Sequence, residues 1–142
     1  MVYEEGQDSF LLGKHVEMFA RGKVLDMGTG TGYLMEVALS QTGNVYGVDI
    51  DDRAVESCKK KGLKVNKSDL LSSVKGKFDV IIFNPPYLPQ DEDMKKHKDL
   101  FGGKNGWETI ERFFEQVGNY LKNNGDILII FSNLTNKKKV DY

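Results

Sequence analysis

The pattern of apolar and polar residues predicts strands that alternate with helices along the chain. Short apolar runs rich in β-branched residues are typical of strands buried on both faces of a parallel sheet. Apolar residues spaced three and four apart predict amphipathic helices that cover such a sheet. We therefore expect one α/β domain over residues 1–142, with a doubly wound, mostly parallel sheet and right-handed crossovers. The predicted strands are residues 23–27, 45–49, 64–66, 78–84 and 126–131, and the predicted helices are residues 8–20, 33–40, 52–61 and 107–121.

Several residues mark where these elements begin and end. Asp52 is placed to cap the third helix, and Gly62 is a suitable C-terminal stop. Asn124 and Gly125 predict a turn immediately before the fifth strand. Residues 88–106 form a long polar segment, and a loop of this length in a compact domain usually serves function.

Composition narrows the classes of protein that the chain can represent. A net charge of −1 argues against an electrostatic grip on nucleic acid by the whole surface, although it leaves room for a local basic patch. The single cysteine, Cys58, excludes an internal disulfide and a cysteine-built zinc site, and we expect no metal. The longest apolar run, residues 127–131, is too short to span a membrane, and Glu4 and Glu5 are unlike a signal peptide. We expect a cytoplasmic protein without a membrane partner.

A glycine-rich loop follows the first strand and precedes a helix. Gly28, Gly30 and Gly32 let a ligand approach the backbone and the helix N-terminus closely. Tyr33 occupies a position where a dinucleotide fingerprint needs glycine, which disfavours an NAD-dependent oxidoreductase. Asp26 lies in the strand before the loop and is placed to meet an ammonium group. The alternative for Asp26 is a surface or capping aspartate.

Two further carboxylates follow the next two strands. Asp49 ends the second strand, where a carboxylate can accept hydrogen bonds from both hydroxyls of a ribose. Asp69 follows the third strand and could accept from an adenine amino group. The alternatives are a helix cap for Asp49 and a turn for Asp69. Together with Asp26, these residues predict a pocket for an adenosine that carries an amino acid, which is S-adenosylmethionine.

The fourth strand ends in Asn84-Pro85-Pro86-Tyr87, because proline cannot donate a ladder hydrogen bond. The nitrogen of an amide or aryl amine is a poor nucleophile, since its lone pair is delocalised. The Asn84 side-chain oxygen and the Pro85 carbonyl could accept both N–H hydrogens and stabilise positive charge as it develops. Tyr87 could pack against the flat group. The alternative is a turn without chemistry.

These motifs resemble those of known methyltransferases. V-L-D-M-G-T-G-T-G at 24–32, V-D-I-D at 48–51 and N-P-P-Y at 84–87 resemble class I (Rossmann-like) S-adenosylmethionine-dependent methyltransferases that act on nitrogen. Three longer stretches resemble the HemK group, which methylates the glutamine of the Gly-Gly-Gln motif in peptide release factors. The short N-terminus resembles the archaeal and eukaryotic branch of that group. The three stretches are V-Y-E-E-G-Q-D-S-F-L-L at 2–12, N-P-P-Y-L-P at 84–89 and G-G-K-N-G at 102–106.

The resemblance implies roles for particular residues. Asn84, Pro85 and Tyr87 would be catalytic, and these three with Pro86 would bind the substrate amide. The residues implied in cofactor binding are Ser9, Asp26, Gly28, Thr29, Gly30, Gly32, Asp49, Ile50, Asp69, Leu70 and Asn84. The branch also implies a heterodimer, in which a small zinc-binding activator subunit covers an apolar sheet edge.

The resemblance further implies a domain layout, with an N-terminal cap helix in residues 1–22 and a core in residues 23–142. The family fold has seven strands and the pattern here predicts five, so we expect either a C-terminus truncated before a final helix and hairpin or a reduced domain. The fifth strand would then have an exposed edge that pairs with another chain.

Three alternatives to glutamine methylation stay open. The motif also suits a methyltransferase for adenine or guanine, with the base flipped into the pocket and stacked on Tyr87. The net charge and the acidic residues 91–93 disfavour nucleic acid. Some relatives methylate lysine. A non-catalytic module that binds the cofactor is disfavoured by the intact motif at 84–87.

Overall fold

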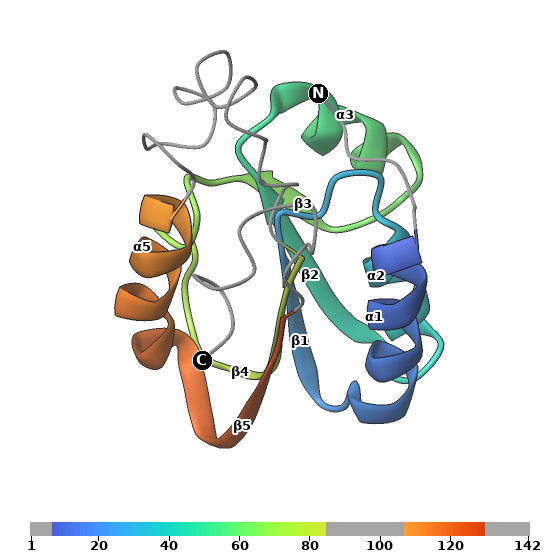
Figure 1. Ribbon diagram of the computed structural model, residues 1–142. Coiled ribbons are helices and arrows are strands. Elements are labelled where there is room, and N and C mark those ends of the chain that lie inside the picture. The colour runs from blue at the N-terminus through green and yellow to red at the C-terminus, as the bar shows by residue number, and fades with distance from the viewer. Residues whose placement is uncertain (1–6, 85–106, 130–142) are drawn as a thin grey trace.

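Five parallel strands form the centre of the molecule, in the order β3-β2-β1-β4-β5 (Figure 1). The computed structural model describes residues 7–84 and 107–129. The alternation of strands and helices along the chain requires crossover connections, which make neighbouring strands parallel, as predicted. The strands are β1 Lys23–Met27, β2 Asn44–Asp49, β3 Val65–Lys67, β4 Phe78–Phe83 and β5 Leu121–Ile129.

Helices cover both faces of the sheet, which confirms the doubly wound α/β class (Figure 1). α1 and α2 lie on one face, and α5 lies on the other. Within the described parts of the chain, no helix is both long and apolar enough to cross a membrane. The helices are α1 Gln7–Phe19, α2 Tyr33–Leu39, α3 Asp52–Lys60 and α5 Trp107–Val117, followed by the 3₁₀ helix η1 Gly118–Tyr120.

Alternation of side chains along the strands produces two hydrophobic cores. Val80 and Ile82 of β4 point to the core shared with α1, α2 and α3. Ile81 and Phe83 point to the opposite core, where the rings of Phe83 and Phe113 of α5 lie 4.4 Å apart between centroids. Burying an apolar side chain of this size stabilises the fold by roughly 1.5–3 kcal/mol. The middle strands are therefore fixed from both sides.

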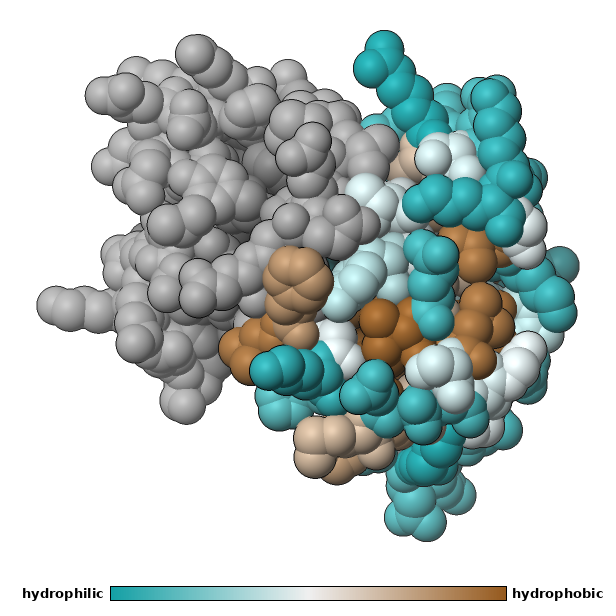
Figure 2. All heavy atoms as spheres, turned by 90° about the vertical axis from the view of Figure 1, so that its right-hand side faces the viewer, coloured by the Kyte–Doolittle hydropathy of each residue, from teal (hydrophilic) through white to brown (hydrophobic). Residues whose placement is uncertain are grey.

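The face that carries α1 and α2 keeps some apolar side chains at the surface. Figure 2 shows these apolar patches divided by hydrophilic side chains. Isolated apolar side chains are ordinary on a protein surface, since polar groups cannot cover it completely. The large exposed ones on these two helices are Phe10, Leu11, Met18, Phe19 and Leu39.

The order of the strands reverses between β1 and β4. β1 pairs with β2 on one side and with β4 on the other, with Asp26 level with Ile82 and Met27 level with Phe83. One further step along this register brings Gly28 level with Asn84. In open α/β sheets, ligands bind at the carboxyl ends of the strands where the order reverses. The fold therefore places the glycine loop and Asn84 on the two sides of that point.

Two predicted boundaries near β2 and β3 are corrected by the structure. The N-cap of α3 is Asp51 rather than Asp52, because its carboxylate accepts the Arg53 N–H at 2.9 Å. β3 covers residues 65–67 instead of 64–66. Adjacent aspartates are equivalent in sequence terms, and only the backbone path decides which of them caps the helix.

The boundary between α5 and β5 also differs from the prediction. α5 ends at Val117 and not at Leu121, because Leu121 pairs with Phe78 as the start of β5. The predicted turn at residues 124–125 lies inside β5, where Asn124 has a positive φ of 65° and the register shifts before Asp126. The strand thus begins earlier than residue 126 and contains an irregularity, while residues 130 and 131 lie outside the described part.

Candidate active site

The glycine loop after β1 is held by backbone hydrogen bonds to β2. The N–H groups of Gly28 and Thr29 both donate to the Val48 carbonyl, at 2.8 and 3.1 Å. Gly28, Gly30 and Gly32 have φ values of 80°, 55° and 86°. This left-handed region is costly for residues with a Cβ atom, so the loop needs glycine at these three positions.

Asp49 is fixed at the carboxyl end of β2 by two backbone donors. Its Oδ2 accepts the Gly30 N–H at 2.8 Å, and its Oδ1 accepts the Asp51 N–H at 2.9 Å. Each carboxylate oxygen has a further lone pair to offer a ligand. Asp51 caps the following helix, so the capping alternative for Asp49 is wrong. Next to it, Ile50 exposes 56% of its surface, which suits a flat apolar partner.

Asp26 is a buried carboxylate in β1, with 1% of its surface exposed. Among the described residues, no group hydrogen-bonds to either Asp26 oxygen or to the buried Thr29 hydroxyl. Burial raises the pKa of Asp26 to about 7, and the Asp49 charge adds to this. The Thr29 hydroxyl lies near enough to oppose the shift, but its geometry is not that of a hydrogen bond.

The burial of Asp26 rules out the surface alternative. A carboxylate buried without a partner costs free energy, and such groups cluster at functional sites. A ligand with an ammonium group would supply the missing partner. The structure thus fits an amino-acid cofactor at this position by the chemistry of its own residues.

The space beside the loop also suits a ligand. Among the described residues, a Cβ atom added to Gly28 would meet no atom within 4 Å, whereas one added to Gly32 would lie 2.6 Å from a Leu63 methyl carbon. Gly28 is therefore exposed in the part of the chain that the structure describes, and Gly32 allows close packing beneath the loop. Cys58 is buried there, with its Sγ 3.5 Å from the Gly30 carbonyl oxygen, as expected of a core cysteine.

The segment after β3 brings Asp69 and Leu70 to the same edge of the sheet. The Ser68 N–H donates to the Asp49 carbonyl at 3.0 Å, which joins this segment to the end of β2. Leu70 is buried with a positive φ of 53°. Asp69 is exposed and forms an ion pair with Arg112 of α5 at 3.1 Å. Arg112 was not predicted, because nothing in the sequence links two polar residues so far apart.

Asn84 follows β4 directly and is half-buried. Pro85, Pro86 and Tyr87 lie outside the described residues, and so does the side chain of Ser9 in α1. Asp49, the glycine loop and Asn84 therefore stand at the carboxyl ends of three adjacent strands, β2, β1 and β4. Their catalytic and binding roles stay predictions.

Tyr33 contributes a contact that the sequence did not reveal. It begins α2 immediately after the loop, and a Cβ atom added to Gly13 of α1 would lie 3.0 Å from its hydroxyl oxygen. The rings of Phe10 and Tyr33 meet edge to face at 5.7 Å. The absence of a side chain at Gly13 thus lets α1 pack closely on the helix that follows the glycine loop.

The sheet order and the site define a doubly wound domain of the methyltransferase type. The family model described as "Methyltransferase small domain" matches residues 6–140. The chain belongs to this family, and it is a methyltransferase that uses S-adenosylmethionine.

Relatives within the family confirm the resemblance seen in the sequence. A candidate protein N5-glutamine methyltransferase of Methanocaldococcus jannaschii is 42% identical over 97% of this chain and 76% of its own length. The release factor glutamine methyltransferase of Aquifex aeolicus is 35% identical over 73% of this chain and 44% of its own length. The chain therefore spans about three quarters of the first relative and less than half of the second.

Among solved structures, the E. cuniculi Mtq2-Trm112 complex is similar to this chain with a TM-score of 0.66 and 35% identity. The match covers 82% of this chain and 68% of that one. The E. cuniculi complex is responsible for methylation of the eRF1 translation termination factor.

Proposed function

We propose that this protein transfers the methyl group of S-adenosylmethionine to the side-chain amide nitrogen of a glutamine in a peptide release factor. The observation that carries the proposal is the position of Asn84, one register step beyond the pairing of Met27 with Phe83 and so level with Gly28. Both relatives are named as glutamine methyltransferases, the A. aeolicus one for release factors, and the E. cuniculi complex methylates a translation termination factor, which together support this substrate.

In this proposal, the cofactor is held by groups from three strands. Asp49 accepts from the ribose hydroxyls, Asp26 pairs with the amino-acid ammonium, and Ile50 packs on the adenine. Asp69 accepts from the adenine amino group. Hydrogen bonds to a charged group contribute roughly 1.5–3 kcal/mol each. When bound, the cofactor supplies an electrophilic methyl carbon on a sulfonium.

The substrate amide is held by the motif that follows β4. The Asn84 side-chain oxygen and the Pro85 carbonyl accept its two N–H hydrogens, and Tyr87 packs against its plane. The hydrogen bonds strengthen as positive charge develops on the nitrogen, so they favour the transition state over the ground state. The buried surroundings of β4 keep Asn84 in place while the substrate binds.

We also propose a small activator subunit as a partner, by analogy with the Trm112 chain in the E. cuniculi complex. A substrate that serves translation would place the enzyme in the cytoplasm.

The test is transfer of labelled methyl to purified release factor, with and without the candidate activator. We expect incorporation at the glutamine of the Gly-Gly-Gln motif and none in a release factor whose glutamine is replaced. tRNA and rRNA serve as controls for the nucleobase alternative. Incorporation into RNA but not into release factor would overturn the proposal.

Asn84→Ala separates catalysis from cofactor binding. We expect turnover to be lost while the affinity for S-adenosylmethionine in calorimetry stays within a few-fold of wild type. Asn44→Ala is the matched control, since Asn44 is exposed at the opposite end of β2. Full activity of Asn84→Ala would remove Asn84 from the catalytic role.

A further inference from the structure

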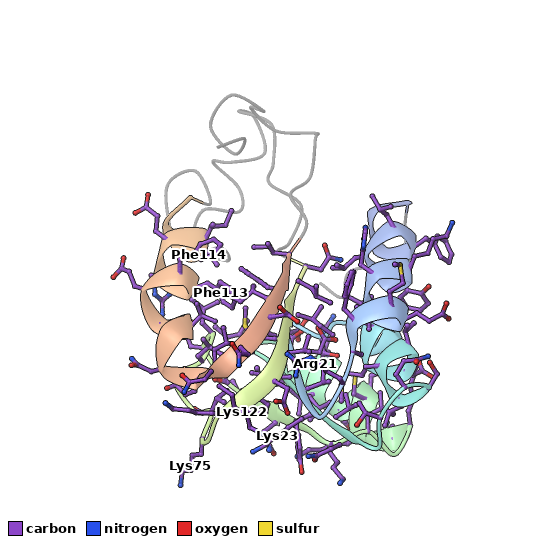
Figure 3. All side chains as sticks on the ribbon, turned by 90° about the horizontal axis from the view of Figure 1, so that it is seen from below. Arg21, Lys23, Lys75, Phe113, Phe114 and Lys122 are labelled. Carbon is purple, nitrogen blue, oxygen red and sulfur yellow. The ribbon has the colours of Figure 1, made fainter. Side chains whose placement is uncertain are left out.

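Six basic side chains gather on the side of the sheet where the strands begin, away from the candidate active site. Figure 3, seen from below, shows four of them, Arg21, Lys23, Lys75 and Lys122, grouped on this underside. We call the whole set the basic track. It consists of Arg21, Lys23, Lys64, Lys75, Lys77 and Lys122.

The side chain of Lys23 lies between Lys64 and the loop before β4 that carries two further members of the track. Its ammonium lies 4.7 Å from the centroid of the Phe78 ring and 5.6 Å from that of Tyr46. The Lys64 ammonium lies 5.3 Å from the same Tyr46 ring. A Cβ atom added to Gly76 would lie 3.1 Å from the Lys23 ammonium, which places the loop that carries Lys75 and Lys77 beside it.

Asp79, at the start of β4, contacts the members of the track that belong to β1, to β5 and to the segment before β1. It accepts the Lys23 backbone N–H at 2.8 Å and the Lys122 ammonium at 3.1 Å, and it pairs with Arg21 at 3.5 Å. These donors, the Lys23 N–H foremost, lower the pKa of Asp79, so it stays charged. Arg21 also pairs with Asp126 at 3.5 Å.

Two carboxylates thus balance Arg21 and Lys122. No carboxylate in the described ranges pairs with the other four members of the track, Lys23, Lys64, Lys75 and Lys77. The track therefore concentrates positive charge in a chain whose net charge is −1. The expectation against nucleic acid rested on the net charge of the whole chain and on the acidic residues 91–93, and it left room for a local basic patch such as this one.

The geometry of the track favours a long polyanion over a single phosphate. Its residues stand at the starts of β3, β1, β4 and β5, or just before them. The four members without a carboxylate partner span three inter-strand steps, from β3 to β4, and at about 4.8 Å for each step they extend over roughly 14 Å. The track is rich in lysine, a residue depleted from the cores of protein–protein interfaces. Lysines in a line suit the repeated charges of a phosphodiester backbone.

We infer that the basic track binds the phosphate backbone of RNA, without reading its sequence. The choice of RNA rests on the proposed function, because a translation termination factor works on the ribosome, which is rich in RNA. Binding there would hold the enzyme close to its substrate while leaving the opposite end of the sheet open for catalysis.

The experiment measures fluorescence anisotropy of a labelled 20-nucleotide single-stranded RNA mixed with the full chain. For single-stranded RNA, each phosphate contact adds about 0.7 to the slope with which log affinity falls against log salt concentration. The four lysines without a carboxylate partner therefore predict roughly 50-fold weaker binding at 200 mM than at 50 mM salt. The variant Lys64→Gln/Lys75→Gln/Lys77→Gln keeps only Lys23 of these four lysines. The same change in salt should then weaken binding only roughly threefold.

The matched control is Lys14→Gln/Lys59→Gln/Lys60→Gln, which removes the same charge from exposed positions on α1 and α3. It should keep the wild-type salt dependence. Methyl transfer to free release factor should be unchanged in both triple variants, so a failure of the track and a failure of the proposed function give different results. The inference is overturned if RNA does not bind at 50 mM salt, if both variants weaken binding equally, or if duplex DNA or polyglutamate binds more tightly than RNA.

Discussion

The Gly30 amide donates a hydrogen bond to Oδ2 of Asp49 across 2.8 Å, which joins the glycine loop to the end of the neighbouring strand. The second oxygen of Asp49 accepts the Asp51 amide at 2.9 Å. One carboxylate therefore positions both the loop and the start of α3. A ligand that binds Asp49 meets a group whose orientation is already fixed, so little entropy is lost on binding.

Replacement of Asp49 by alanine should weaken the binding of S-adenosylmethionine by at least roughly tenfold, because hydrogen bonds to a charged group contribute roughly 1.5–3 kcal/mol. Asp49→Asn should lie between wild type and alanine, since the amide oxygen can still accept from Gly30. Calorimetry measures the affinity. Asp52→Ala is the control, since Asp52 is exposed and its ion-pair partner within the described ranges is Lys67. An affinity unchanged in Asp49→Ala would remove Asp49 from the ribose role.

Gly28→Ala should lower the affinity for S-adenosylmethionine by more than its loss of fold stability explains. The added methyl meets none of the described residues on the side of the loop where the cofactor is proposed to approach, and the positive φ costs roughly 1–2 kcal/mol. Gly62→Ala is a matched control, because Gly62 has a φ of 84° and a Cβ atom there would likewise meet no described atom within 4 Å. Thermal melts should show similar losses for both variants. Equal cofactor affinities in the two variants would show that the ligand does not approach Gly28.

The buried Asp26 predicts a specific dependence of stability on pH. The folded chain holds the Asp26 proton up to a pH of about 7, whereas the unfolded chain releases it near 3.8. In that window the folded state binds more protons, so the free energy of unfolding falls as pH rises. The contribution of Asp26 changes by up to roughly 1.4 kcal/mol for each pH unit.

Asp26→Asn removes this titration. Denaturant unfolding without cofactor should show the variant gaining stability relative to wild type between pH 5 and pH 8. Asp52→Asn, at an exposed site, should follow wild type at both pH values. If the difference between wild type and Asp26→Asn does not change with pH, the pKa of Asp26 is not raised.

Phe113 and Phe114 are adjacent in α5 but differ in environment (Figure 3). Phe113 is fully buried against Phe83, whereas Phe114 exposes 46% of its surface. Phe113→Ala should cost roughly 3–5 kcal/mol in denaturant unfolding, because it leaves a cavity. Phe114→Ala should cost much less. Similar losses in both variants would mean that α5 does not pack on the sheet as described.

Most of the fold could be predicted because apolar runs and glycines mark the strands and loops directly. The start of β5 could not, since Leu121 continues the apolar stripe of α5 and only its pairing with Phe78 shows that it belongs to the sheet. Local spacing favours the helix there, and tertiary pairing decides against it.

The candidate site was predictable in part for a similar reason. Asp49 and Asn84 could be placed because each directly follows a strand, and strand ends meet at one edge of a parallel sheet. The extent of burial of Asp26 depends on what α2 and α3 cover, which no local pattern encodes. The ion pair of Asp69 with Arg112 joins segments 43 residues apart and is visible only in three dimensions.

The pairing of β1 with β4 has a consequence for the lifetime of the enzyme. These strands meet across a long connection, as the bond between Lys23 and Asp79, 56 residues apart, illustrates. Closing such a connection costs chain entropy, which the buried contacts of these two middle strands offset, so opening between β1 and β4 accompanies unfolding of the whole sheet. A cofactor bound across both strands would oppose that opening by mass action. We expect resistance to proteolysis to rise with the supply of methyl donor, which would couple the abundance of the enzyme to the metabolic state of the cell.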